Sequence, residues 1–151
     1  MANQEQVEAY NRREISRIAG AFKAMDEQAT KEAQQSGGAL AEFLRGKIIE
    51  KAFGMRKGTQ VAVRVAQGSQ VAKTSKVGEL KLGFASQRFS GGGTTKELWA
   101  GQEFGSKKFT QFPSWNPQGY FIYPALRENQ TELVKQWEQS FERIVDKYGR
   151  D

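Results

Sequence analysis

The chain has 151 residues, with 23 Lys plus Arg, 17 Asp plus Glu, no His and no Cys, for a formal net charge of +6. A chain of this length can form one domain with a hydrophobic core. Without His or Cys it has no imidazole-based catalytic triad, no thiol nucleophile, no disulfide and no zinc site built from these residues. We therefore expect a protein that is not an enzyme, with no catalytic residues, no bound metal and no cofactor.

The distribution of apolar and charged residues indicates where the protein is located and what kinds of partner it has. No stretch approaches the roughly 20 apolar residues of a membrane-spanning helix, and the polar first ten residues lack the apolar core of a secretory signal. These features predict a soluble protein without a membrane partner. Residues 60–123 carry eight basic and only three acidic side chains. That excess is compatible with nucleic-acid contact, but a basic surface patch or a subunit interface is the favoured interpretation because no nucleic-acid motif is present.

The first half of the chain predicts a helical hairpin. Apolar residues from Val7 to Ala29 recur mostly every three or four positions, so residues 1–36 are expected to form a long N-terminal helix. The glycines of Ser36-Gly37-Gly38 are expected to end this helix in a turn. Residues 39–53 then repeat the helical pattern with a broader apolar face, which predicts a second helix packed against the first.

From residue 59 the apolar period changes from helical to two. Val61, Val63 and Val65 alternate with smaller or polar residues, which is typical of a half-buried strand. A second alternating stretch runs from Glu79 to Phe84. Together these stretches predict a small antiparallel sheet over residues 59–86.

Residues 87–123 are expected to hold Gly-rich and aromatic loops around a short helix. The run Gly91-Gly92-Gly93 predicts a flexible loop, and the helix should span residues 95–100 with Thr94 or Thr95 as its cap. The stretch 109–120 is too aromatic for a disordered linker and too rich in Pro and Gly for a regular element. It is interpreted as an ordered loop whose rings pack on the protein itself or on a neighbouring subunit.

A long helix is expected to close the chain over residues 124–148, with Pro124 at its start and Gly149 at its end. We expect its apolar stripe to pack against the sheet. The members of that stripe include Leu133, Trp137, Phe141 and Ile144. The predicted fold is thus a single α+β domain over residues 1–151, with an N-terminal helical hairpin, a small antiparallel β-sheet, an aromatic loop and a C-terminal helix packed on the sheet.

Two candidate chemical sites are weak. Residues 91–96 superficially resemble a phosphate-binding loop, but Lys96 does not directly follow a glycine and no Ser or Thr comes after it. The acidic residues of the middle segment, Glu79, Glu97 and Glu103, could in principle form an acid–base pair. Nothing in the sequence fixes two of them at a suitable spacing, so salt bridges at the surface or at an interface are the favoured role.

The second half of the chain carries a resemblance to a known family. Its motifs are Glu103-Phe104-Gly105-Ser106, then Gln111-Phe112-Pro113, Gly119-Tyr120-Phe121 and Tyr123-Pro124-Ala125-Leu126-Arg127. This order resembles the small neck or tail-completion proteins of long-tailed bacteriophages. It is similar to the tail-component family of lambdoid phages, to which the lambda Z-type minor tail protein is related. The match covers about residues 95–148, and the aromatic segment 109–119 is longer here than in that family.

The resemblance implies a non-enzymatic structural protein at the head–tail junction of the virion, assembled in the host cytoplasm. It would form a ring, with a hexamer as the expected arrangement, because heterologous contacts with a suitable rotation close into rings. Its neighbours would be the head-closure or connector protein and the tail terminator or major tail tube protein. Two main alternatives stay open: a tail terminator that caps the tail tube, and a nucleic-acid-binding protein that uses the basic aromatic middle segment. An uncharacterised hydrolase is a weaker third.

Two sets of candidate residues follow from this interpretation. The predicted subunit interface consists of Trp99, Glu103, Phe104, Phe109, Phe112, Trp115, Tyr120, Tyr123 and Arg127. The basic side chains that could contact packaged DNA without sequence specificity are Arg64, Lys73, Lys76, Lys81, Arg88, Lys107 and Lys108.

Overall fold

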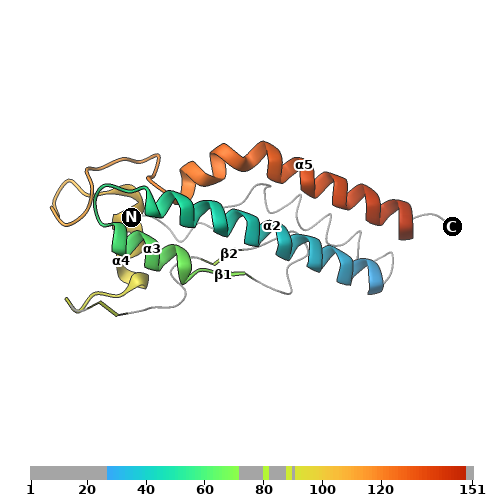
Figure 1. Ribbon diagram of the computed structural model, residues 1–151, viewed down its shortest axis with the longest axis horizontal. Coiled ribbons are helices and arrows are strands. Elements are labelled where there is room, and N and C mark those ends of the chain that lie inside the picture. The colour runs from blue at the N-terminus through green and yellow to red at the C-terminus, as the bar shows by residue number, and fades with distance from the viewer. Residues whose placement is uncertain (1–26, 72–79, 82–87, 90, 149–151) are drawn as a thin grey trace.

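The computed structural model describes residues 27–71, 80–81, 88–89 and 91–148. This part of the protein is mostly helical (Figure 1). Helix α2 spans Glu27–Phe53, α3 spans Thr59–Gln67, α4 spans Thr95–Phe104 and α5 spans Ile122–Tyr148. Two short strands, β1 at Gln70–Val71 and β2 at Leu80–Lys81, pair antiparallel, with Val71 opposite Leu80.

The long helices α2 and α5 lie side by side and antiparallel along the long axis of the molecule (Figure 1). Ion pairs join them near both ends: Lys51 to Glu128 at 2.5 Å, and Lys147 to Glu32 at 2.7 Å. Their facing stripes supply most of the buried core, which includes Ala29, Ala33, Leu40, Leu44, Ile48, Leu126, Leu133, Trp137 and Ile144. Among the described elements, the main partner of α5 is therefore α2 and not the short strand pair.

Helix α2 continues through the predicted turn at residues 36–38. Glycines inside a helix each cost about 1 kcal/mol relative to Ala, so a tertiary contact must offset them. Gly37 is buried, and it lies in the half of α2 that runs beside the end of α5. In that half, α5 carries the stacked rings of Trp137 and Phe141, with 5.4 Å between ring centroids. The predicted separation into helices over 1–36 and 39–53 is wrong at its turn, and residues 1–26 lie outside the described part of the chain.

Residues 59–67 form helix α3, so the predicted strand at Val61, Val63 and Val65 is wrong. The same residues also satisfy a helical spacing, because Ala62, Val65 and Ala66 share the buried face of α3. Burial of that face against α2 and α4 overrides the preference of valine for strands. The sheet predicted over residues 59–86 is not shown: its described residues contain only the short pair of β1 and β2, and residues 72–79 and 82–87 lie outside the described part.

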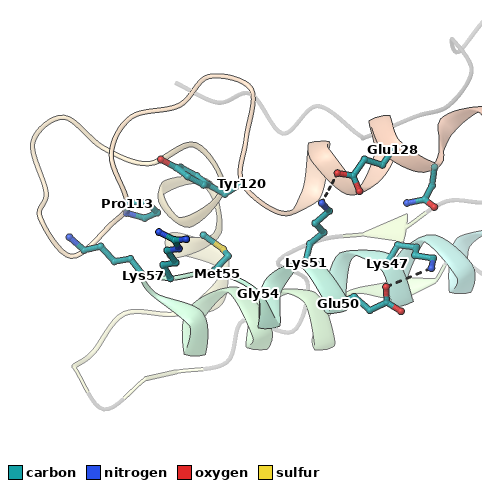
Figure 2. A pocket seen from close by; sticks show the side chains of 11 residues that line it. Lys47, Glu50, Lys51, Gly54, Met55, Lys57, Pro113, Tyr120 and Glu128 are labelled. Atoms are coloured by element: carbon teal, nitrogen blue, oxygen red, sulfur yellow. Dashed lines mark hydrogen bonds and ion pairs between the residues drawn. The ribbon is translucent and has the colours of Figure 1, made fainter.

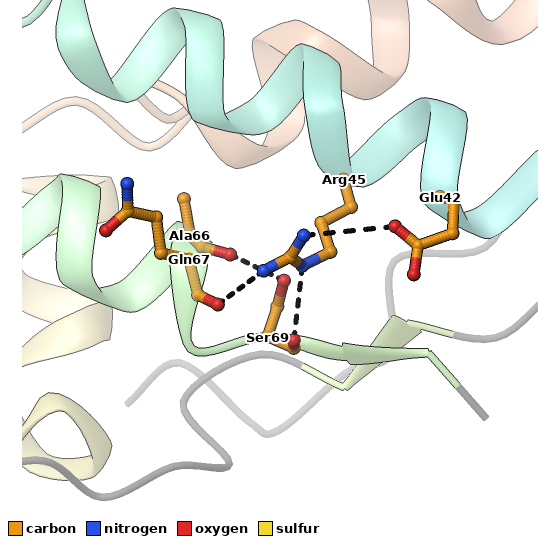
Figure 3. Close-up of polar contacts among 5 residues, drawn as sticks. All are labelled: Glu42, Arg45, Ala66, Gln67 and Ser69. Atoms are coloured by element: carbon orange, nitrogen blue, oxygen red, sulfur yellow. Dashed lines mark hydrogen bonds and ion pairs between the residues drawn. The ribbon is translucent and has the colours of Figure 1, made fainter.

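The end of α3 is fastened to α2 by Arg45 (Figure 3). Its guanidinium donates to the backbone carbonyl oxygens of Gln67 at 2.6 Å and Ser69 at 3.3 Å, and it also lies 3.8 Å from a carboxylate oxygen of Glu42. The last carbonyl groups of a helix lack partners within the helix and carry a partial negative charge. A cation from α2 therefore fixes where α3 ends and how it leaves the long helix.

The predicted helices in the second half are confirmed, with adjusted bounds. Helix α4 begins after Thr94, whose hydroxyl oxygen accepts from the backbone N–H of Glu97 at 3.3 Å, but the helix runs on to Phe104. Helix α5 begins two residues before Pro124, which lies in the first turn, where a missing N–H costs no hydrogen bond. These two helices bracket the segment that holds the sequence motifs.

Candidate functional site

The centre of the second half is the buried carboxylate of Glu103, at the end of α4. Its Oε1 atom accepts from the backbone N–H groups of Tyr120 at 2.5 Å and Phe121 at 2.8 Å. Its Oε2 atom accepts from those of Ile122 at 2.7 Å and Tyr123 at 2.9 Å. The first N–H groups of a helix have no acceptor within the helix. A carboxylate from α4 therefore caps the start of α5.

The electrostatic setting of this carboxylate combines two opposing effects. Burial raises the pKa of Glu103 above its ordinary value of 4.5, and the four backbone donors oppose that rise. The partial positive charge at the start of α5 also favours a negative group there. The predicted role of Glu103 in a surface or interface salt bridge is wrong for the described structure, because its side chain is fully buried and bonds to backbone of its own subunit.

Two glycines frame the loop between α4 and α5. Gly105 has a φ of +74° and Gly119 a φ of +86°, in the left-handed region that favours glycine. A Cβ atom on Gly105 would collide with the carbonyl oxygen of Ser114, and one on Gly119 would lie 2.8 Å from Oε1 of Glu103. Gly105 and Gly119 are therefore required for two reasons: the backbone has a positive φ at both positions, and neither position has room for a side chain.

The loop over residues 105–121 contains no helix or strand, and internal bonds hold it. The backbone N–H of Ser106 donates to the carbonyl of Pro113 at 2.9 Å, and the hydroxyl of Tyr120 donates to the carbonyl of Ser114 at 2.7 Å. The ring of Phe112 fills the space where a side chain on Gly101 would lie. The loop is thus tied to α4 and α5 at several points.

The loop presents two large rings to solvent. Phe109 is 53% exposed and Trp115 is 50% exposed, whereas Pro113 between them is buried. Of the other predicted interface residues, Glu103 is buried and Arg127 is exposed, and five aromatic residues are half-buried: Trp99, Phe104, Phe112, Tyr120 and Tyr123. Among the rings of the predicted interface set, Phe109 and Trp115 are therefore the two that are largely exposed.

The predicted DNA-facing residues that the structure describes come from several different segments of the chain. Lys107 and Lys108 are exposed on the loop after α4, and Arg88 is exposed in the turn before α4, where it pairs with Thr94 in an isolated β-bridge. Arg64 on α3 lies over the ring of Phe89, 4.7 Å from its centroid. Lys73 and Lys76 lie outside the described residues, as does the side chain of Lys81 in β2.

The Gly-rich turn before α4 is closed by backbone bonds. The N–H of Phe89 donates to the carbonyl of Gly93 at 2.8 Å, and the N–H of Gly92 donates back to Phe89 at 3.0 Å. In place of the expected flexible loop, its described residues form a tight turn. The side chain of Thr94 then caps α4, so the segment that resembles a phosphate loop serves as a helix start.

A groove that the sequence did not indicate lies between the end of α2, the connection to α3, the aromatic loop and the first turns of α5 (Figure 2). Its volume is about 840 Å³. Its lining residues are Lys47, Glu50, Lys51, Gly54, Met55, Arg56, Lys57, Pro113, Tyr120, Glu128 and Asn129. Four basic side chains of the lining lie within eleven positions of the sequence. The opposite wall, from the aromatic loop and α5, comes close to them only in the folded chain.

Among the described residues, no three His, Cys, Asp or Glu side chains gather as metal ligands. None of the described helices has the length and hydropathy of a transmembrane span. No protein-family model, no curated protein and no solved structure matches this chain.

Proposed function

We propose that this protein is a structural component of a long-tailed bacteriophage virion, located at the head–tail junction, where it assembles as a ring that joins or completes head and tail. The sequence resemblance over residues 95–148 supports this proposal. The motifs of this resemblance also contact one another within one subunit. The Glu103 carboxylate accepts hydrogen bonds from the backbone of Tyr120 and Phe121, and Gly105 packs closely against the backbone of Ser114.

The observation that carries the proposal is the rigid loop with its two outward rings. Large aromatic side chains are enriched at the centres of protein interfaces. Phe109 and Trp115 extend from a backbone that is already fixed, so little conformational entropy is lost when a partner covers them. In a ring, that partner is the neighbouring copy. Each subunit then uses one face to contact a different face of the next subunit.

The proposed ring is a hexamer of this chain in the neck or tail of the virion, assembled in the host cytoplasm. On one side it would contact the head-closure or connector protein, and on the other the tail terminator or major tail tube protein. The role is structural and involves no catalytic step, metal or cofactor.

The test is complementation of a phage in which the gene is disrupted. We expect the lysate to contain filled heads and finished tails that are not joined, and purified protein to restore joined, infectious particles. Interface rings of this kind contribute about 2 kcal/mol or more each, so Phe109→Ala with Trp115→Ala should weaken a subunit contact roughly a thousandfold. Phe53→Ala is the matched control, because Phe53 is also exposed but lies at the end of α2.

The readouts are particle titre, electron microscopy of the lysate and native mass spectrometry of the purified protein. Circular dichroism should show that the double variant keeps its helices, because both rings lie outside the core. A double variant that assembles and joins heads to tails as well as the Phe53→Ala control would overturn the interface assignment. Normal joining in a lysate without the gene product would overturn the proposed function.

The same lysate separates the main alternatives. A tail terminator limits growth of the tail tube, so its loss would give tails of irregular length rather than finished tails. A nucleic-acid-binding protein would bind DNA with an affinity that falls steeply with salt, because phosphate contacts dominate. Because the sequence carries no nucleic-acid motif and the described basic side chains come from several segments, we expect only weak, sequence-independent affinity.

A further inference from the structure

We infer that the groove between α2, α5 and the aromatic loop is a docking site for an acidic peptide segment of a partner protein, with an apolar side chain beside its carboxylates. This inference does not depend on the neck proposal, since it rests on the charge and shape of the groove alone. It concerns a surface different from the outward rings of Phe109 and Trp115.

The charge of the groove is positive at one end. Its two carboxylates are already engaged, Glu128 with Lys51 at 2.5 Å and Glu50 with Lys47 at 3.6 Å (Figure 2). Lys57 and its neighbour Arg56 are exposed, and neither has an acidic partner within the part of the chain that the structure describes. This end of the groove therefore holds two cations that an incoming pair of carboxylates can neutralise.

Beside these cations the groove offers an apolar surface. Met55, Pro113 and the ring of Tyr120 lie together at the end of the groove near Lys57, across from the Lys51–Glu128 pair (Figure 2). Met55 is half-buried and Pro113 is buried, so the surface is part of the folded loop rather than a set of free side chains. An aliphatic or aromatic side chain next to an acidic one fits this combination.

The walls of the groove are held in place before any partner arrives. The hydroxyl of Tyr120 is bonded to Ser114, and its backbone N–H is bonded to Glu103. On the opposite wall, the amide of Gln102 donates to the carbonyl of Lys57 at 2.8 Å. A preformed site loses little free energy to ordering when it binds.

The same features argue against a nucleic-acid strand as the occupant. A polynucleotide needs cations spaced along its backbone together with rings on which bases stack. Here Arg56 and Lys57, which have no acidic partner among the described residues, occupy one end, and two carboxylates, Glu50 and Glu128, line the other. A short segment with two or three carboxylates matches that pattern better than a chain of phosphates.

The experiment is a titration of the 15N-labelled full chain, followed by NMR, with three probes. The first is the acetylated and amidated hexapeptide Glu-Asp-Phe-Glu-Leu-Asp; the second replaces each acidic residue with Lys; the third is hexathymidylate. We expect the acidic peptide alone to shift the backbone amides of Gly54, Met55 and Lys57 in a saturable manner, with a Kd below about 1 mM.

The matched variants compare charge reversal inside and outside the groove. Arg56→Glu with Lys57→Glu should weaken binding of the acidic peptide about tenfold or more, because two attractions become repulsions. Lys96→Glu with Lys135→Glu makes the same change in net charge at exposed positions elsewhere and should leave the Kd unchanged. If the reversed pair disturbs the fold, Arg56→Gln alone gives the same direction with a smaller change.

Each other outcome overturns the inference. Saturable shifts with hexathymidylate in place of the acidic peptide would assign the groove to nucleic acid. Equal shifts with the basic peptide would show that charge plays no part. Absence of saturation with the acidic peptide, or equal weakening in the two charge-reversed variants, would show that this groove is not the docking site.

Discussion

The substitution Glu103→Gln should destabilise the start of α5. The amide has the size of the carboxyl group but only one acceptor oxygen, so two of the four backbone N–H groups at the start of α5 would face an NH2 group. A buried donor left without a partner costs about 1–3 kcal/mol. We therefore expect a loss of about 4 kcal/mol, which is a large share of the roughly 5–15 kcal/mol that stabilises a domain.

The measurement combines thermal unfolding with amide hydrogen exchange. A loss of about 4 kcal/mol corresponds to a decrease in Tm of roughly 8–16 °C for a chain of this size. Exchange at Tyr120–Tyr123 should accelerate more than exchange in the middle of α5. Glu97→Gln is the control: this exposed residue lies in the first turn of α4, and its change should cost less than about 1 kcal/mol. If Glu103→Gln unfolded like that control, the carboxylate cap would not stabilise the start of α5.

The remaining predictions concern the α2–α5 pair. Trp137→Ala should cost roughly 3–5 kcal/mol and give poorly folded protein, whereas the exposed Gln139→Ala should be near neutral; urea unfolding of both decides this. Hydrogen bonds from Lys147 and Tyr148 hold the pKa of Glu32 below its ordinary value of 4.5. The Glu32 carboxylate therefore binds a proton more readily in the unfolded chain than in the folded one. Its ionised form stabilises the fold above pH 4.5, and this contribution is lost as the pH falls through the lowered pKa of the folded state. Tm measured across acid pH should differ between wild type and Glu32→Gln near neutrality and converge in acid, and a constant difference would refute this.

The elements that could be predicted from the sequence are those with local signals. The start of α4 is determined by the hydroxyl of Thr94, and α5 carries a long apolar period with Pro124 in its first turn. The elements predicted wrongly depend on partners far away in the chain. Gly37 is buried inside α2, which packs along α5, and the alternation from Val61 to Val65 is also compatible with a helix once its buried face meets α2 and α4.

The site was predictable only in part. The sequence predicts an ordered aromatic loop and its motifs, but it favours a salt bridge for Glu103, whose carboxylate instead caps the start of α5. A usable signal was present: Gly119, Tyr120 and Phe121 before α5 cannot cap a helix with their side chains. Glu103 is also the only acidic residue between positions 98 and 127. The groove had no such signal, because its two walls come from segments about sixty positions apart.

The two ion pairs between α2 and α5 also favour one alignment of these helices along each other. Glu32 and Lys51 are 19 positions apart in α2, and Glu128 and Lys147 are also 19 positions apart in α5. At about 1.5 Å per residue both intervals span roughly 28 Å. A slip of one helix along the other by a single turn, about 5.4 Å, would therefore break both pairs together. Surface ion pairs are individually weak, but matched spacing lets two of them select one alignment from several that apolar packing alone would tolerate.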